Sequence, residues 1–170
     1  MNNPHSQDYT GECHERGMSA EKLFAVIARR RGNKIKPATK KEQFKHFDYH
    51  MKDANGHVWK IEVKAAKKKS RSDSEVDSSI QYVEFKNVNG FNGWLIGQSD
   101  FIAFEREDDF VIVRRNHLLN LSNKLVDKSK FTQRPTLYKS YRRKSRPLEH
   151  TSMIKMDDIL TLNHSLWSKD

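Results

Sequence analysis

The sequence predicts a mixed α/β domain, in which a short sheet of about five strands carries an N-terminal helix on one face. One segment near the N-terminus has apolar residues at helical spacing, and five later segments have the alternation or composition typical of strands. The chain has 170 residues, of which 35% are hydrophobic and 32% charged. A chain of this length and composition is expected to fold as one domain around a small core.

Residues 19–31 are expected to form the helix. Ser19 is a favourable N-cap, Glu21 places a carboxylate near the positive end of the helix dipole, and Gly32 is typical of a helix end. One face of the helix is apolar and consists of Leu23, Phe24, Val26 and Ile27. Residues 1–17 show no such periodicity, and we interpret them as a flexible arm.

Two alternating segments, residues 44–51 and 58–65, predict a pair of strands joined by a tight loop. A loop rich in lysine and serine at 67–79 is expected to be mobile. The remaining elements are expected in the order strand 81–88, structured turn 89–97, hairpin 101–105 with 110–114, helix 116–126 and short helix 156–162. Trp94 and Phe91, in the structured turn, are expected to lie in the core, with a platform for base stacking as the alternative.

The register of the first hairpin depends on its loop. A three-residue loop at 54–56, with Gly56 in the left-handed conformation, places Asp48 directly opposite Glu62. A two-residue turn at 55–56 instead turns Asp48 to the other face. The three-residue loop is favoured because it also aligns the apolar residues Phe47, Tyr49, Ile61 and Val63.

The charge of the chain favours a polyanionic partner. Lys and Arg total 32 against 22 Asp and Glu, which gives a formal net charge of +10. Nucleic acid is favoured over a membrane surface because no long basic amphipathic helix is visible. No apolar segment is long enough for a membrane span or a signal peptide, so we expect a soluble cytoplasmic protein. Cys13 is the single cysteine, which excludes an intrachain disulfide and a cysteine-based zinc finger.

Two basic segments are candidate DNA contacts. The first consists of Lys67, Lys68, Lys69 and Arg71, and the second contains Arg142 and Arg143 next to the aromatic Tyr141. Lysine and arginine bind phosphates without reading sequence, and a tyrosine stacks on an exposed base. The alternative interpretation is a solvated loop and a flexible basic tail.

The candidate chemistry lies in Asp48 and the triplet Glu62-Val63-Lys64. Glu62 and Lys64 project from the same strand face because they are two residues apart. Two neighbouring carboxylates repel each other and favour a cation, and Mg²⁺ accepts one or two carboxylates plus water and a substrate phosphate. A lysine beside them can orient or deprotonate the attacking water, so these are the groups needed to hydrolyse a phosphodiester. The alternative is a solvated sheet face with ordinary ion pairs.

The order of these motifs resembles the PD-(D/E)xK nuclease superfamily, which includes restriction endonucleases and the phage-type and archaeal Holliday junction resolvases. The resemblance covers residues 19–114, and residues 83–88, 93–95 and 102–105 are also similar to small phage-type nuclease-like proteins. It implies a restriction-endonuclease-like core within residues 18–127, followed by a basic C-terminal extension, 128–170, with a short helix. Phe47 stands where the family usually has proline before the first acid.

The resemblance also implies roles for individual residues. Asp48 and Glu62 would bind the metal, Lys64 would be the catalytic lysine and Glu21 an accessory helix acid. A rival register within the family uses Glu62 as the first acid and completes the site with Glu84 and Lys86. Glu84 can instead be an additional metal or water contact, provided that its strand neighbours that of Glu62.

The expected function is Mg²⁺-dependent endonucleolytic cleavage of DNA, with Mn²⁺ able to substitute and a 5′-phosphate product implied by the resemblance. A resolvase of branched DNA acting as a homodimer is the leading subtype, with location in the host cytoplasm if the protein is phage-encoded. A restriction-type endonuclease is the alternative enzyme. The competing class is a non-catalytic, basic nucleic-acid-binding domain.

Overall fold

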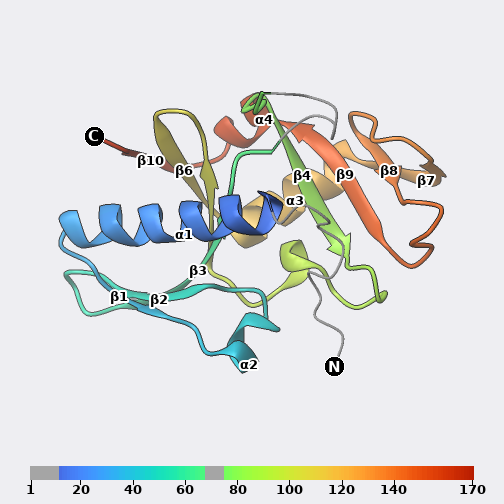
Figure 1. Cartoon of the computed structure of the whole chain (residues 1–170). Helices are drawn as coiled ribbons and strands as arrows, with labels where there is room; N and C mark the ends of the chain where they lie inside the picture. The colour runs from blue at the N-terminus through green and yellow to red at the C-terminus, as the bar shows by residue number, and fades with distance from the viewer. Residues whose placement is uncertain (1–11, 68–74) are drawn as a thin grey trace.

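The computed structural model describes residues 12–67 and 75–170, which form an α/β fold with two mixed sheets (Figure 1). The larger sheet has the order β1-β2-β3-β5-β6-β10, and the smaller has the order β4-β9-β8-β7. The strands of the larger sheet are β1 (Lys34–Pro37), β2 (Tyr49–Lys52), β3 (Val58–Lys64), β5 (Phe101–Glu105), β6 (Asp109–Arg114) and β10 (His164–Ser168). Those of the smaller are β4 (Ile80–Lys86), β7 (Asp127–Thr132), β8 (Lys139–Tyr141) and β9 (His150–Lys155). The helices are α1 (Glu12–Arg30), α2 (Lys40–Gln43), α3 (Arg115–Leu125) and α4 (Met156–Leu160).

Helix α1 begins earlier than the sequence predicted. Residues 12–17, assigned to the arm, are helical, because extending an established helix costs little once the following turns are anchored. Residues 1–11, the rest of the predicted arm, lie outside the described residues. The predicted C-terminal end is confirmed: Gly32 has φ +82°, and the N–H of Asn33 donates to the carbonyl of Ala28 at 3.0 Å. This is the Schellman arrangement that satisfies the last carbonyls of a helix.

The hairpin of β2 and β3 has the predicted register. Tyr49 pairs with Ile61 and Lys52 with Val58, and Gly56 has φ +86°, as the three-residue loop requires. The predicted start of the first strand at residue 44 is wrong. Residues 44–48 are turn and irregular chain, and the strand begins at Tyr49. Residues 40–43, to which no element was assigned, form α2, because Thr39 and Glu42 cap one helical turn with reciprocal hydrogen bonds.

The prediction of a single sheet of about five strands is corrected to two sheets. Strand β4 does not join β3; it pairs antiparallel with β9, while β3 takes the parallel strand β5 as its neighbour. The predicted hairpin of β5 and β6 and the helices at 116–126 and 156–162 are confirmed to within two residues. Residues 127–170 supply four strands that the sequence did not indicate, and β10 closes the larger sheet against β6.

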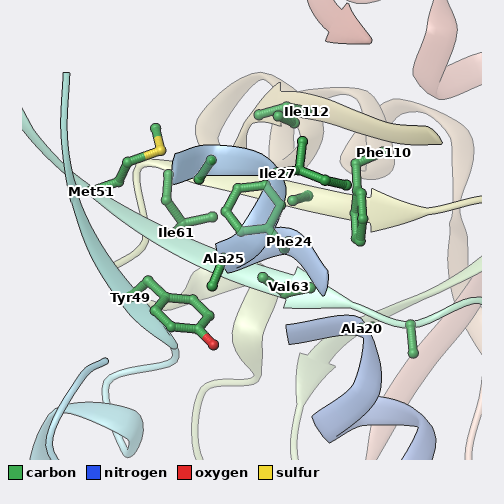
Figure 2. Packing of buried hydrophobic residues seen from close by; sticks show 13 residues of the cluster. Ala20, Phe24, Ala25, Ile27, Tyr49, Met51, Ile61, Val63, Phe110 and Ile112 are labelled. Atoms are coloured by element: carbon green, nitrogen blue, oxygen red, sulfur yellow. The ribbon is translucent and has the colours of Figure 1, made fainter. Parts of the chain in front are cut away.

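The core consists of two apolar layers. In the first, α1 packs on the larger sheet, with Phe24 and Ile27 facing Ile61 and Val63 of β3 (Figure 2). The second lies between the larger sheet, α3, α4 and the smaller sheet, and it includes Trp94. Trp94 is buried as predicted, whereas Phe91 is 72% exposed and is not a core residue. Within the described residues, no helix is both long and apolar enough to cross a membrane.

Candidate active site

Asp48 lies immediately before β2 and is held by three hydrogen bonds, two to β3 and one to the segment that follows β1. Its backbone N–H donates to the carbonyl of Ile61 at 2.8 Å, and its own carbonyl accepts the N–H of Ala38 at 2.7 Å. Its side-chain Oδ2 accepts the backbone N–H of Val63 at 2.7 Å. Continuing the β2–β3 register by one pair places Asp48 opposite Glu62, as the three-residue loop predicted.

Glu62 and Lys64 form an ion pair on the face of β3 that carries the acids. Lys64 Nζ donates to Glu62 Oε1 at 2.5 Å, and Glu62 is only 6% exposed. The same ammonium lies 4.9 Å from the centroid of the Trp94 ring. Because strand side chains alternate, Val63 between them points into the core, where it is also buried.

The electrostatics of this site are those of several acids around one lysine. Burial raises the pKa of Asp48 well above 3.8, and the negative charges of Glu62 and Glu21 raise it further. Burial and the charge of Glu62 also raise the pKa of Glu21, which projects from α1. Lys64 opposes both shifts, so Glu21, Asp48, Glu62 and Lys64 act on one another as a single cluster, named here the acid–lysine cluster.

Lys64 itself is held in its charged form. Burial by itself lowers the pKa of this lysine, but the charges of Glu62 and Asp48 and the hydrogen bond to Glu62 raise it above 10.5. The ammonium is therefore protonated at neutral pH. It acts as a cation and hydrogen-bond donor rather than as a ready base.

Glu84 reaches the cluster from the smaller sheet. Its charge adds to the field that raises the pKa of Lys64, and its Oε1 accepts the backbone N–H of Trp94 at 3.4 Å. From the sequence, Glu84 is expected to be an additional contact only if its strand lies next to β3. Strand β4 does not lie next to β3, because it belongs to the other sheet. Its approach instead depends on Gly93, where an added Cβ would lie 2.4 Å from the Glu84 carbonyl oxygen.

Lys86 lies away from the cluster. A β-bulge separates it from Glu84, and its partner in the β4–β9 register is His150. Its side chain is exposed. The rival register, in which Glu84 and Lys86 complete the site, therefore leaves its lysine outside the cluster, whereas Lys64 lies within it.

Tyr49 is a member of the site environment that the sequence did not indicate. Burial raises the pKa of its hydroxyl, and the charges of Glu21 and Asp48 raise it further. The sequence placed this residue on the apolar face of the hairpin, and its ring is indeed only 7% exposed and packs near Phe24. Nothing in the alternation distinguishes a tyrosine whose hydroxyl faces acids from one that only fills the core.

The predicted DNA contacts are only partly placed. Lys68, Lys69 and Arg71 lie outside the described residues, and Lys67 is half-buried at the end of the preceding segment. Arg143 makes a bidentate pair with the buried Glu149, at 2.9 and 3.2 Å. The Arg142 guanidinium instead lies 4.2 Å from the centroid of the Phe131 ring.

Two carboxylates of the cluster, those of Asp48 and Glu62, are suitable ligands for a hard divalent cation. Among residues 12–67 and 75–170, no group of three or more His, Cys, Asp or Glu side chains is arranged to hold a metal ion. Asp48 and Glu62 supply two carboxylates, which is the usual protein share for Mg²⁺. Burial, and then repulsion between the carboxylates, raises the pKa of Asp48 and of Glu21, so an added cation would stabilise their charged forms.

Comparison of this chain with protein-family models, with curated proteins and with solved structures gave no match. The chain's own features are an α/β fold of two mixed sheets and an acid–lysine cluster on the larger sheet, beside α1.

Proposed function

We propose that this chain is a metal-dependent endonuclease that hydrolyses phosphodiester bonds in DNA, with a restriction-endonuclease-like core. The observation that carries the proposal is the convergence of Glu21, Asp48 and Glu62 on Lys64 from α1, the segment before β2, and β3. Clusters of acids with strongly raised pKa values are costly to folding, and proteins keep them chiefly at functional sites.

Asp48 and Glu62 are the residues that would hold Mg²⁺ or Mn²⁺. When bound, the ion would polarise the phosphoryl oxygen and lower the pKa of a water molecule. Asp48 offers its second oxygen, since Oδ2 already accepts the Val63 N–H. Glu62 offers Oε2, since Oε1 accepts from Lys64.

Lys64 supplies the positive charge next to the reacting phosphate. Because its ammonium is protonated at neutral pH, it donates hydrogen bonds to a phosphate oxygen or to the attacking water and stabilises the negative charge of the transition state. Trp94 and Glu84 fix its position, the ring by lying 4.9 Å from Nζ and the acid by its charge. Glu21, whose pKa is raised by burial and by the charge of Glu62, is the accessory acid that holds a proton more readily than an exposed glutamate does.

Branched DNA is the proposed substrate, cut by a homodimer. The net charge of +10 supplies affinity for the phosphate backbone, and this contact is independent of sequence. A restriction-type enzyme is the alternative within the class. A non-catalytic DNA-binding domain is the alternative outside it, with the acids then serving only the structure.

The test compares cleavage of a four-way junction, linear duplex and single-stranded DNA in Mg²⁺, in Mn²⁺ and in EDTA. Glu62→Gln and Lys64→Met are expected to lower the cleavage rate at least about a hundredfold while DNA binding persists. The matched control is Lys60→Met, which removes another lysine of β3 whose ammonium lies over Phe47, outside the cluster. It should cleave at the wild-type rate.

Three outcomes separate the alternatives. Preference for the junction, with dimers in light scattering, supports the resolvase. Cleavage at defined sequences in linear duplex supports the restriction-type enzyme. Binding without metal-dependent cutting by any form of the protein would overturn the enzymatic proposal in favour of the binding domain.

A further inference from the structure

Cations and aromatic rings alternate on the smaller sheet. The Nζ of Lys128 lies 4.4 Å from the centroid of Phe85, and the guanidinium of Arg142 lies 4.2 Å from that of Phe131. The ring of His150 joins the two, at 4.6 Å from Phe85 and 5.0 Å from Phe131. Lys128 lies on β7 and Arg142 directly follows β8, the strand paired with β7, so the two cations stand on neighbouring parts of one surface.

Lys86 adds a third charge to this surface. Lys86 is the β-sheet partner of His150. Burial lowers the pKa of this histidine most, and the positive charges of Lys128 and Lys86 lower it further. In the part of the chain that the structure describes, Lys86, Lys128 and Arg142 form no ion pair with an acid. The nearby acids are already used, Asp127 by Lys139 and Glu149 by Arg143. We call Lys86, Lys128 and Arg142 the basic surface.

Phe91 stands beside this surface in the turn that follows β4. The turn is fixed: the Phe91 N–H donates to Asn87 Oδ1 at 3.1 Å, and the Asn87 N–H donates to the Phe91 carbonyl at 2.9 Å. A β-bridge then joins Asn92 to Lys86. A phenylalanine that is 72% exposed on an ordered turn gains nothing from the fold, and an aromatic ring in water is a stacking surface for a base.

We infer that the basic surface and Phe91 bind an unpaired nucleic-acid strand, with phosphates on Lys86, Lys128 and Arg142 and a base stacked on Phe91. Phosphate contacts alone would serve duplex equally well, but a stacking ring requires a base that is free of its partner. Binding of this strand does not depend on catalysis.

The position of the surface relates it to the acid–lysine cluster. Glu84 and Lys86 are two residues apart on β4, or about 7 Å along an extended strand. A strand that lies on the surface therefore leads toward Lys64, which Glu84 helps to hold. This placement rests on the proposed function and names its substrate class: DNA with an unpaired segment next to the bond that is cut.

The experiment measures binding in EDTA, so that failure of the catalytic proposal leaves it intact. The probe is a fluorescein-labelled oligothymidylate of about 16 nucleotides, compared by anisotropy with a duplex of equal length over a range of salt concentrations. The triple variant Lys86→Ala, Lys128→Ala, Arg142→Ala is expected to lower the dependence of log affinity on log salt by about 2, or about 0.7 for each phosphate contact. Phe91→Ala should weaken single-strand binding about tenfold, with Phe91→Trp restoring it.

The controls separate this surface from general charge and from misfolding. The triple Lys34→Ala, Lys36→Ala, Lys52→Ala removes the same charge from exposed positions on β1 and β2, which Figure 1 draws at the opposite end of the molecule. It should bind like wild type, as should Lys86→Arg with Lys128→Arg. Equal loss in both triples, or a Phe91→Ala effect as large on duplex as on single strand, would overturn the inference. The inference would also be overturned if the protein bound phosphatidylserine vesicles through the basic surface but did not bind oligothymidylate.

Discussion

The Asp48 carboxylate extends the hydrogen-bond ladder of the β2–β3 hairpin, because its Oδ2 accepts the backbone N–H of Val63 at 2.7 Å. The paired residues of β2 and β3 end at Tyr49 and Ile61. Beyond this pair, the Asp48 carboxylate accepts the Val63 N–H that a strand carbonyl would otherwise accept. Glu62 and Lys64 flank Val63 in the chain. One side chain-to-backbone bond therefore sets the position of the first acid relative to the second acid and the lysine.

Asp48→Asn is expected to stabilise the protein at neutral pH by about 1 kcal/mol. Burial and the charges of Glu62 and Glu21 raise the pKa of Asp48 in the folded state. The folded chain then binds the proton more tightly than the unfolded chain, so the free energy of unfolding falls as pH rises from 3.8 toward the folded pKa. The asparagine keeps an oxygen for the Val63 N–H and carries no charge.

The measurement is urea unfolding of both proteins at about pH 4 and about pH 7. The stabilisation should be small at the lower pH and larger at the higher one. Asp108→Asn, at an exposed acid of the β5–β6 turn, is the control and should show no such growth. A difference between Asp48→Asn and wild type that does not change with pH would contradict the argument.

Mg²⁺ is expected to raise the thermal unfolding temperature of the wild-type chain. A ligand that binds only the folded state adds about 2.7 kcal/mol when it is present at about 100 times its Kd. Glu62→Gln should reduce the shift because it removes one of the two carboxylates proposed to hold the ion. Calorimetry with and without Mg²⁺, followed by EDTA, checks this, and an equal shift in Glu62→Gln would count against the site.

Gly93→Ala is expected to destabilise the fold by about 2 kcal/mol or more. The new Cβ would lie 2.4 Å from the backbone oxygen of Glu84 and 2.6 Å from its Cγ, and a backbone carbonyl in a sheet cannot move aside cheaply. Gly17→Ala is the matched control: no atom lies within 4 Å of its Cβ, and its helical position should give about 1 kcal/mol of stabilisation. Thermal unfolding of both variants distinguishes these opposite signs.

Arg143→Ala is expected to cost about 2 to 3 kcal/mol of folding stability, because it leaves the buried Glu149 without its bidentate partner. Arg142→Ala should cost much less, since the guanidinium donates one hydrogen bond, to the Pro147 carbonyl at 3.3 Å, and has no acid partner in the described chain. Denaturant unfolding of the two variants measures the difference. Similar stabilities would show that both arginines serve only as surface charges.

Local features were predicted well where a short stretch of chain decides them. The end of α1 depends on Gly32, and the register of β2 and β3 depends on the loop that ends at Gly56; both glycines take the positive φ that their turns require. This register is what brings Asp48 next to Glu62 and Lys64. The helical turn at α2 was missed even though its Thr39–Glu42 capping box is visible in the sequence, because four residues are too few to show helical periodicity.

The sequence by itself determined the α/β class, the hairpin register and the grouping of Asp48, Glu62 and Lys64, because capping, turn geometry and alternation act between near neighbours. The place of Glu21 beside them was implied only by the family resemblance. Only the tertiary structure decided that β4 pairs with β9, that β10 completes the larger sheet, and that Glu84 approaches Lys64 from the other sheet. Those outcomes depend on which distant strands share hydrogen bonds and on the close approach of Gly93 to Glu84. No local pattern encodes them, because the free energy of pairing two distant strands depends on the residues of both strands together.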